Sequence, residues 1–483
     1  MSPAFIARVQ VWIACALFAC LGVWLAQRNG MLDAGYWIDE AIAVGIASYD
    51  FVDIPDALRQ DGSPPLYYLL LHGWMAIAGS DEAATRSLSL LFAVVTVPVA
   101  LWGAAAIAGR RAGLVAAACA ACSPFITFQA HETRMYSLVV VLSLIASAAF
   151  VLAFMRGHRW HLVTLGASSV LLLYTHTWGV FLVAGMGVGW LWLWRTGRVE
   201  GRDGLLVAGA VALLFAPWLP TLVFQALHTG APWSERPSPL ILVAVVLAVV
   251  AVVRLRSDSD QPIRLLLLIA AATLAFAWIS SQAQPAWSVR YFAVLSGPLL
   301  LAAACALVGG RHWVALPAVV AVSVWFVVGP QPGKSNARAV AGSMAVDVRP
   351  GDLVVSTQPE QVPVLNRYLP AGVRYLTPLG FPADPRLTDW RDALPELRRG
   401  RASRVLIPRL RELEPGRRVL LVTPVPRSRP SKAPWLRSVW ARTHEWRAII
   451  RRDPRLRPLG ATSRVEPGRF RAPVRAELYE VVP

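Results

Sequence analysis

Long apolar segments recur along the first two thirds of this 483-residue chain, and they constrain its fold more than any other feature. A run of roughly 15–25 apolar residues between charged or turn residues has the length that a helix needs to cross a bilayer. The chain is 56% hydrophobic and only 16% charged, which is more apolar surface than one soluble core requires. The pattern therefore predicts a polytopic α-helical membrane protein.

About eleven segments have this length and composition. They are Val11–Ala26, Ala84–Ala108, Leu114–Phe128, Tyr136–Phe154, Leu162–Tyr174, Trp178–Trp194, Leu205–Phe224, Leu240–Val253, Leu265–Ile279, Tyr291–Val308 and Trp313–Val328. The first is expected to be a retained signal anchor, because further spans follow it and no small-x-small cleavage site is present. The five cysteines all lie in apolar segments, so they predict neither a disulfide framework nor a metal site.

The composition changes after about Gln331, where the apolar runs stop and Arg and Pro become frequent. Short strand-like runs follow at 352–357, 404–408, 417–425 and 476–482, and residues 429–438 are expected to form an irregular loop. We therefore predict a transmembrane domain over residues 1–330, with a first external loop at 28–83, and a soluble α/β domain over residues 331–483.

The distribution of arginines predicts the orientation in the membrane. If the N-terminus is cytoplasmic, the loops on that side are rich in arginine, and these residues are Arg8, Arg110, Arg111, Arg156, Arg159, Arg195, Arg198, Arg202, Arg254, Arg256, Arg264 and Arg311. The positive-inside rule then places the N-terminus in the cytoplasm, and an odd number of spans places the C-terminal domain outside a plasma membrane. Most of the net charge of +18 lies in that domain, but the positive-inside rule does not cover whole translocated domains, so the predicted orientation stands. From its positive charge we expect anionic headgroups or polymers as the partners of the domain, and no nucleic acid.

Four polar clusters fall on the predicted outer side, each within a few residues of an apolar segment. They contain Asp39, Glu40 and Asp61; His131, Glu132 and Arg134; His176; and Gln282, Gln284 and Arg290. Ionisable groups near membrane depth are costly and mark functional sites. A carboxylate can take a proton from an attacking hydroxyl, and arginines at helix starts can hold a phosphate. The clusters predict a site that binds an anionic headgroup and deprotonates an acceptor.

Simpler interpretations stay open at this point. Arg134 and Arg290 are also explained as interfacial arginines whose heads reach water. His176 is also explained as a hydrogen-bonded residue at a helix end. Asp39 and Glu40 are also explained as the cap of a helix that begins at Ala41.

Several motifs resemble a known family. In order along the chain they are "YWIDEA", "DGSPPLYYLLLHGWMAIAGSDEAATRSLSLLFAV", "SPFITFQAHETRMYSLVVVLSLIAS", "LLLYTHTWGVFLV" and "SVRYFAVLSGPLL". Over about residues 1–330 the chain resembles bacterial GT-C glycosyltransferases, above all glycosyltransferase family 39 (protein O-mannosyltransferase-like), which is related to the lipid A aminoarabinose transferases. The resemblance implies a multispan enzyme that moves a hexosyl or pentosyl group, with inversion, from a polyprenyl-phosphate sugar to a glycan, lipid or protein acceptor.

The resemblance also implies roles for individual residues. Asp39 is expected to be the catalytic base or the group that positions the acceptor, with Glu40 as its neighbour. Arg134, Arg290 and Tyr136 are expected near the carrier phosphate, and the sugar or acceptor is expected to contact His131, Glu132, His176 and Asp61. The segment Pro64–Ala78 is too short to span and is expected to form an interfacial helix.

A single displacement requires one base on the acceptor side and charge stabilisation on the phosphate side. No His-x-x-x-His or Cys-pair motif predicts a metal site, although acids such as Asp39 and Glu132 are suitable ligands for a divalent cation. Two alternatives remain from other functional classes: a transporter or lipid-linked-sugar flippase, and an inactive scaffold. Polar residues at the centres of the spans, together with inverted repeats, would favour a transporter.

Overall fold

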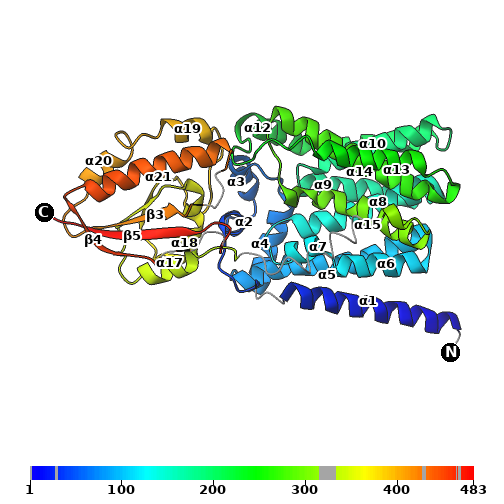
Figure 1. Cartoon of the computed structure of the whole chain (residues 1–483), viewed down its shortest axis with the longest axis horizontal. Helices are drawn as coiled ribbons and strands as arrows, with labels where there is room; N and C mark the ends of the chain where they lie inside the picture. Colours follow the sequence, from blue (N-terminus) through cyan, green and yellow to red (C-terminus); the bar gives the residue numbers. More distant parts are fainter. Residues whose placement is uncertain (1–2, 28–30, 315–332, 427–430, 464, 466–468) are drawn as a thin grey trace.

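The computed structural model describes residues 3–27, 31–314, 333–426, 431–463, 465 and 469–483. Figure 1 shows an elongated molecule: long helices fill one half, and a sheet flanked by helices fills the other. We call the second half, residues 333–483, the C-terminal region.

The helical half is built from long apolar helices. Their bounds are α1 Pro3–Gln27, α5 Glu82–Ala108, α6 Arg110–Ala121, α8 Tyr136–Arg156, α9 Trp160–Thr175, α10 Gly179–Arg195, α11 Gly201–Phe215, α13 Ile241–Arg254, α14 Gln261–Ala283 and α15 Ala293–Val308. In the described part of the chain, five helical segments are long and apolar enough to cross a membrane: Glu82–Ala108, Tyr136–Arg156, Gly201–His228, Gln261–Ala283 and Val289–Val308. The chain is therefore mostly helical and has the candidate spans of a membrane protein.

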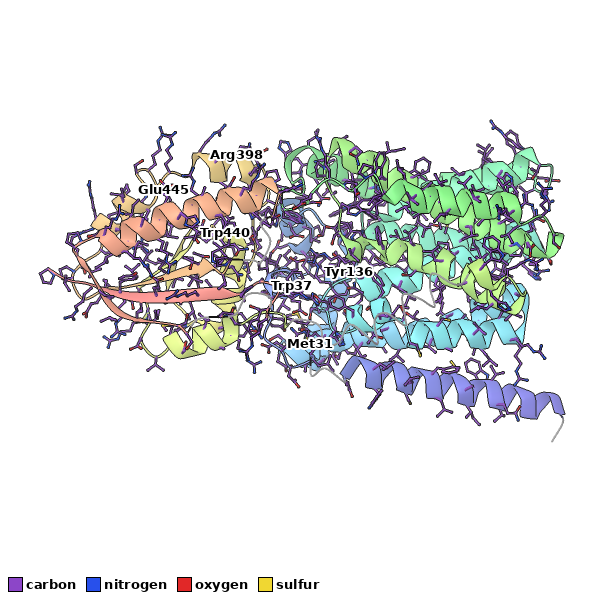
Figure 2. All side chains as sticks on the ribbon, viewed as in Figure 1. Met31, Trp37, Tyr136, Arg398, Trp440 and Glu445 are labelled. Carbon is purple, nitrogen blue, oxygen red and sulfur yellow. The ribbon has the colours of Figure 1, made fainter. Side chains whose placement is uncertain are left out.

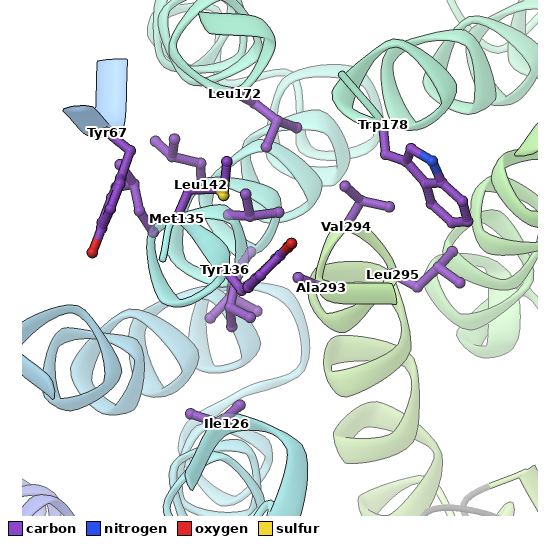
Figure 3. Packing of buried hydrophobic residues seen from close by; sticks show 14 of the residues in the cluster. Tyr67, Ile126, Met135, Tyr136, Leu142, Leu172, Trp178, Ala293, Val294 and Leu295 are labelled. Atoms are coloured by element: carbon purple, nitrogen blue, oxygen red, sulfur yellow. The ribbon is translucent and has the colours of Figure 1, made fainter. Parts of the chain in front are cut away.

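Helix α8 is the most buried of these five spans, and it packs against α5, α9 and α15. Figure 3 shows the side chains that meet there, including Tyr136 of α8 beside Ala293 and Val294 of α15. The contact with α15 is close at Gly297, where an added Cβ would lie 2.3 Å from the carbonyl oxygen of Ser143. A small residue at this position lets the two backbones approach.

One predicted span is divided in the structure. The segment Leu114–Phe128 is not one helix, because α6 ends at Ala121 and a separate helix, α7, covers Pro124–Gln129. Ser123 caps α7 by accepting a hydrogen bond from the Ile126 N–H at 3.4 Å, and Pro124 cannot continue α6. The predicted span Leu205–Phe224 falls within the candidate span Gly201–His228, in which the 3-10 turn η1 (Ala216–Trp218) joins α11 to α12 (Leu219–His228). The last predicted span, Trp313–Val328, lies almost wholly outside the described residues.

The first predicted external loop folds into three short helices, α2 (Ile38–Ala47), α3 (Ile54–Asp61) and α4 (Leu66–Ala78). Helix α4 confirms that residues 66–78 are helical. A helix capped by Asp39 and starting at Ala41 is wrong, because α2 starts at Ile38 with Trp37 as its N-cap. Both acids therefore lie in the first turn of α2, where carboxylates are favoured by the helix dipole.

The C-terminal region contains a five-stranded sheet with the order β2-β1-β3-β5-β4. The strands are β1 Leu353–Ser356, β2 Arg374–Leu376, β3 Arg418–Pro424, β4 Leu456–Ala461 and β5 Val474–Val481, and the helices are α17 Ala337–Met344, α18 Val362–Tyr368, α19 Ala393–Arg399, α20 Leu406–Arg411 and α21 Pro434–Arg452. β1 is parallel to β2 and β3, with Val354 opposite Leu420, whereas β5 is antiparallel to β3 and β4. One face packs with α17 and α18 and the other with α20 and α21, which is why the central strands β1 and β3 are apolar on both sides.

Two predictions within this region need correction. Residues 404–408 are not a strand, since α20 begins at Leu406 and places Leu406 and Leu410 against the sheet. A short apolar run does not distinguish a strand from a buried helix. The predicted loop 429–438 includes the start of α21, with Pro434 at its first position, where proline is favoured; residues 427–430 lie outside the described residues.

Candidate active site

A cavity of about 450 Å³ lies where the helical half meets the C-terminal region. We call it the site cavity. Figure 2 shows two residues of its wall, Trp37 and Tyr136, at this junction. Of the nine residues to which the sequence assigned a role, six line the cavity: Asp39, Asp61, Arg134, Tyr136, His176 and Arg290. They come from segments up to 251 residues apart in the chain, and the fold brings them together.

Asp39 and Arg290 form an ion pair at the wall of the cavity, and each side chain is about one fifth exposed. The guanidinium of Arg290 also lies over the rings of Trp37, 5.2 Å from the centroid, and Tyr136, at 5.8 Å. Arg290 belongs to the 3-10 turn η3 (Val289–Phe292) that leads into α15. The aromatic rings hold the guanidinium plane beside the carboxylate by cation–π contact.

Arg134 supplies a second guanidinium, from the turn that precedes α8. Its Nη1 donates to the carbonyl oxygen of Asp39 at 3.3 Å and to the hydroxyl of Tyr68 at 3.2 Å. Tyr68 in turn donates to Asp61 at 3.4 Å, and the Ser63 hydroxyl donates to the same carboxylate oxygen at 2.7 Å. Burial raises the pKa of Asp61, although the charge of Arg134 opposes this. Of the residues predicted from the sequence, two cations and two acids thus share one cavity.

His176 follows α9 and lies between two tyrosine rings of the cavity, Tyr136 and Tyr291. Its Nδ1 accepts the backbone N–H of Trp178 at 3.0 Å, so a neutral ring carries its proton on Nε2. Burial, with the charges of Arg134 and Arg290, lowers the pKa of His176 to about 3. The ring is therefore neutral at physiological pH and acts as a hydrogen-bond donor instead of a proton source.

The other three predicted residues, Glu40, His131 and Glu132, do not line the cavity. Glu40 is fully buried. Its carboxylate accepts hydrogen bonds from the guanidinium of Arg86 at 2.7 and 2.8 Å, the ammonium of Lys334 at 2.7 Å and the backbone N–H of Thr133 at 3.0 Å. Burial by itself raises the pKa of Glu40, but the charges of Lys334 and Arg86 outweigh it and lower this pKa to about 2. Glu40 is thus ionised and fully hydrogen-bonded.

Glu132 belongs to the same cluster. It accepts the indole N–H of Trp37 at 2.7 Å and the guanidinium of Arg471 at 3.0 Å, and Lys334 lies 3.4 Å away. The ammonium of Lys334 also donates to the carbonyl oxygen of His131. We call Glu40, Arg86, Glu132, Lys334 and Arg471 the buried ion network. It joins α2 and α5 to the C-terminal region directly behind the cavity wall.

Several residues of this site were not found from the sequence. Arg86 stands inside a predicted apolar span, and a charge in such a position is a signal that could have been used. Lys334, Arg471 and the cavity residues Glu360 and Trp390 lie in the C-terminal region, where nothing in the local pattern separates them from the many other charged and aromatic residues. In the part of the chain that the structure describes, no group of three or more His, Cys, Asp or Glu side chains is placed to hold a metal ion.

Comparison of the fold with solved structures identifies its class. The structure of ArnT from Cupriavidus metallidurans bound to undecaprenyl phosphate is similar to it over 97% of both chains, with a TM-score of 0.54 and 14% sequence identity. The chain has the GT-C fold. An oligosaccharyltransferase from Archaeoglobus fulgidus, solved with Zn and sulfate, is similar over 84% of this chain and 67% of its own, with 12% identity and a TM-score of 0.46.

No protein-family model and no curated protein matches the sequence. The structural similarity to ArnT, a lipid A aminoarabinose transferase, confirms the predicted resemblance at the level of the GT-C fold.

Proposed function

We propose that the protein is a membrane glycosyltransferase that moves a sugar, with inversion, from a polyprenyl-phosphate carrier to an acceptor hydroxyl. The observation that carries this proposal is the meeting of one carboxylate, Asp39, with two guanidiniums, Arg134 and Arg290, in one cavity. The fold it shares with a structure that holds undecaprenyl phosphate agrees with it. The acceptor belongs to a lipid, an envelope glycan or a protein.

In this mechanism Asp39 takes the proton of the acceptor hydroxyl as its oxygen bonds to the anomeric carbon. The bond from that carbon to the carrier phosphate breaks, and its electron pair leaves with the phosphate. Arg134 and Arg290 hold the phosphate charge, and the neutral His176 donates a hydrogen bond within the cavity. Arg290 pairs with Asp39 in the structure, so an arriving phosphate competes for this guanidinium and frees the carboxylate to act as a base.

A second cavity, of about 400 Å³, suits the carrier's hydrocarbon chain. It lies among α8, α9, α10, α11 and α12, its lining is almost entirely apolar, and it shares Leu222 with the site cavity. We infer from the sequence that about eleven spans carry the site, that the N-terminus is cytoplasmic and that the domain over residues 331–483 is soluble and lies outside the plasma membrane.

The test is to incubate the purified protein with a panel of polyprenyl-phosphate sugars and to measure release of polyprenyl phosphate. We expect Asp39→Asn to slow release by about 10²- to 10⁴-fold, because a general base contributes this much. Asp53→Asn, an exposed acid of the same loop, is the matched control and should equal the parent. Equal rates for Asp39→Asn and the parent would remove Asp39 from the mechanism. A parent that releases no carrier from any donor, yet moves lipid-linked sugar across liposomes, would favour the flippase.

A further inference from the structure

The site cavity contains a third carboxylate that the mechanism above does not use. Glu360 lies in η4 (Pro359–Gln361), immediately before α18, and its side chain is 5% exposed. It lines the cavity together with Gln358, Trp390 and Leu436, which also belong to the C-terminal region. The region therefore forms part of the wall of the candidate active site.

The sheet fixes the position of Glu360. Strand β1 ends at Ser356, and the next residue, Thr357, still donates its N–H to Val422 of β3 at 3.1 Å. The hydroxyl of Ser356 donates to the carbonyl oxygen of Gln358 at 2.8 Å and closes the turn. Glu360 thus follows the carboxyl end of a parallel strand, the edge at which α/β sheets bind ligands.

Only one of its two carboxylate oxygens is satisfied. Oε1 accepts Gln358 Nε2 at 2.7 Å and Trp435 Nε1 at 2.9 Å. Oε2 is buried and has no hydrogen-bond partner among the described residues. A buried carboxyl oxygen without a partner is costly, and because Glu360 lines the cavity, a ligand bound there is the candidate partner.

The environment of Glu360 favours its neutral form. Burial raises the pKa of its carboxyl group, and the charge of Asp39 acts in the same direction, against hydrogen bonds from Gln358, Trp435 and its own backbone N–H. Both side-chain donors point at Oε1, so a neutral Glu360 would carry its proton on Oε2 and could donate a hydrogen bond to a ligand.

Apart from its charged groups, the cavity wall carries aromatic and neutral polar residues. The ring centroids of Trp233 and Trp390 lie 4.5 Å apart, and both residues line the cavity. Ser281 and Gln284 line it as well. Flat aromatic surfaces with neutral hydrogen-bonding groups match the apolar faces and hydroxyl edges of a sugar ring.

We propose that Glu360 binds a sugar oxygen of a carbohydrate-bearing acceptor and presents the acceptor to Asp39. This inference rests on the proposed glycosyl transfer, and it assigns the acceptor side of the cavity to the C-terminal region. The donor side stays with Arg134 and Arg290.

The experiment uses the full chain, a polyprenyl-phosphate sugar that the parent accepts, and n-octyl glycosides of glucose, galactose and mannose as probe acceptors. Glu360→Ala is expected to raise KM for the octyl glycoside about tenfold, because a buried hydrogen bond is lost, with KM for the carrier sugar within about twofold. Glu360→Gln, which keeps an acceptor for Trp435 and a donor to the cavity, is expected to stay near the parent. Glu414→Ala, an exposed acid of the same region, is the control.

Four results would overturn the inference. The first two concern Glu360→Ala: an unchanged acceptor KM, or equal rises in both KM values, since a structural role affects both sides. The third is a Glu360→Gln variant as weak as Glu360→Ala, since this shows that charge is required. The fourth is a parent that transfers to no glycoside but releases carrier with a peptide or a phospholipid. A parent that releases no carrier from any donor would instead overturn the proposed function.

Discussion

Asp39 and Glu40 are neighbours in the sequence, yet they lie in opposite environments. Asp39 is one fifth exposed, lines the site cavity and has one ion-pair partner, Arg290. Glu40 is fully buried and pairs with two cations, Arg86 and Lys334. Successive side chains of a helix point about 100° apart, so the first turn of α2 sends one acid into the cavity and the other into the protein. The comparison teaches that one motif supplies both an acid of the cavity wall and an acid of the buried ion network.

The largest expected effect is a difference in folding stability between the variants Glu40→Gln and Asp39→Asn. Glu40→Gln leaves Arg86 and Lys334 as buried charges without their shared partner, so we expect a loss of about 3–5 kcal/mol in the free energy of unfolding. Thermal unfolding of the detergent-solubilised protein measures it. Asp39→Asn should unfold near the parent temperature while losing turnover. If Glu40→Gln is fully stable and only turnover is lost, the two acids do not differ in the way proposed.

The pH dependence of stability sharpens the same contrast. The pKa of Glu40 in the folded protein is about 2, below its ordinary value of 4.5, so the ionised form is stabilised by folding. This contribution is complete above about pH 4.5 and is lost as the pH falls toward 2. We expect the gap in unfolding temperature between the parent and Glu40→Gln to narrow from pH 5 to pH 3. A gap that stays constant over this range would contradict the assignment.

A smaller effect is expected on the phosphate side of the cavity. A hydrogen bond to a charged group is worth about 1.5–3 kcal/mol, so Arg290→Ala should raise KM for the carrier sugar by roughly 10- to 100-fold. Arg290→Lys keeps the charge but loses the planar guanidinium, so its KM for the carrier sugar is expected to lie between those of the parent and Arg290→Ala. Arg236→Ala, an exposed arginine, serves as the control. An unchanged KM for the carrier sugar in Arg290→Ala would show that Arg290 does not hold the carrier phosphate.

The smallest effect is expected at the second cavity, the apolar one of about 400 Å³ among α8, α9, α10, α11 and α12. A Cβ at Gly187 would meet open space, and this glycine lines the cavity. Gly187→Phe should therefore obstruct a long hydrocarbon chain and raise KM several-fold for a long polyprenyl carrier, but not for a short-chain analogue. Gly209→Phe, on the exposed side of α11, gives the matched control. Equal KM values for both chain lengths would exclude this path for the lipid.

The sequence predicted the part of the site that depends on membrane length and on charge near span ends. Arg134 and Arg290 were found because each precedes an apolar run, and Asp39 because it follows one. Arg86 was missed because it lies inside such a run, and Lys334 because its partner Glu40 is 294 residues away. Sequence spacing cannot express a contact of that kind. The helix α20 was predicted as a strand for a related reason, since a short apolar run fits either element until the sheet beside it is known.

The sequence by itself therefore determined the helical membrane class, the position of most apolar helices and the types of charge available at their ends, because these follow from hydrophobic length and the cost of burying ions. The tertiary structure decided which charges meet. It placed Asp39 with Arg290 in a cavity, enclosed Glu40 between Arg86 and Lys334, and brought Glu360 to the wall. Those outcomes depend on how helices and the sheet pack across long sequence separations, and packing of that kind is fixed only when the whole chain is folded.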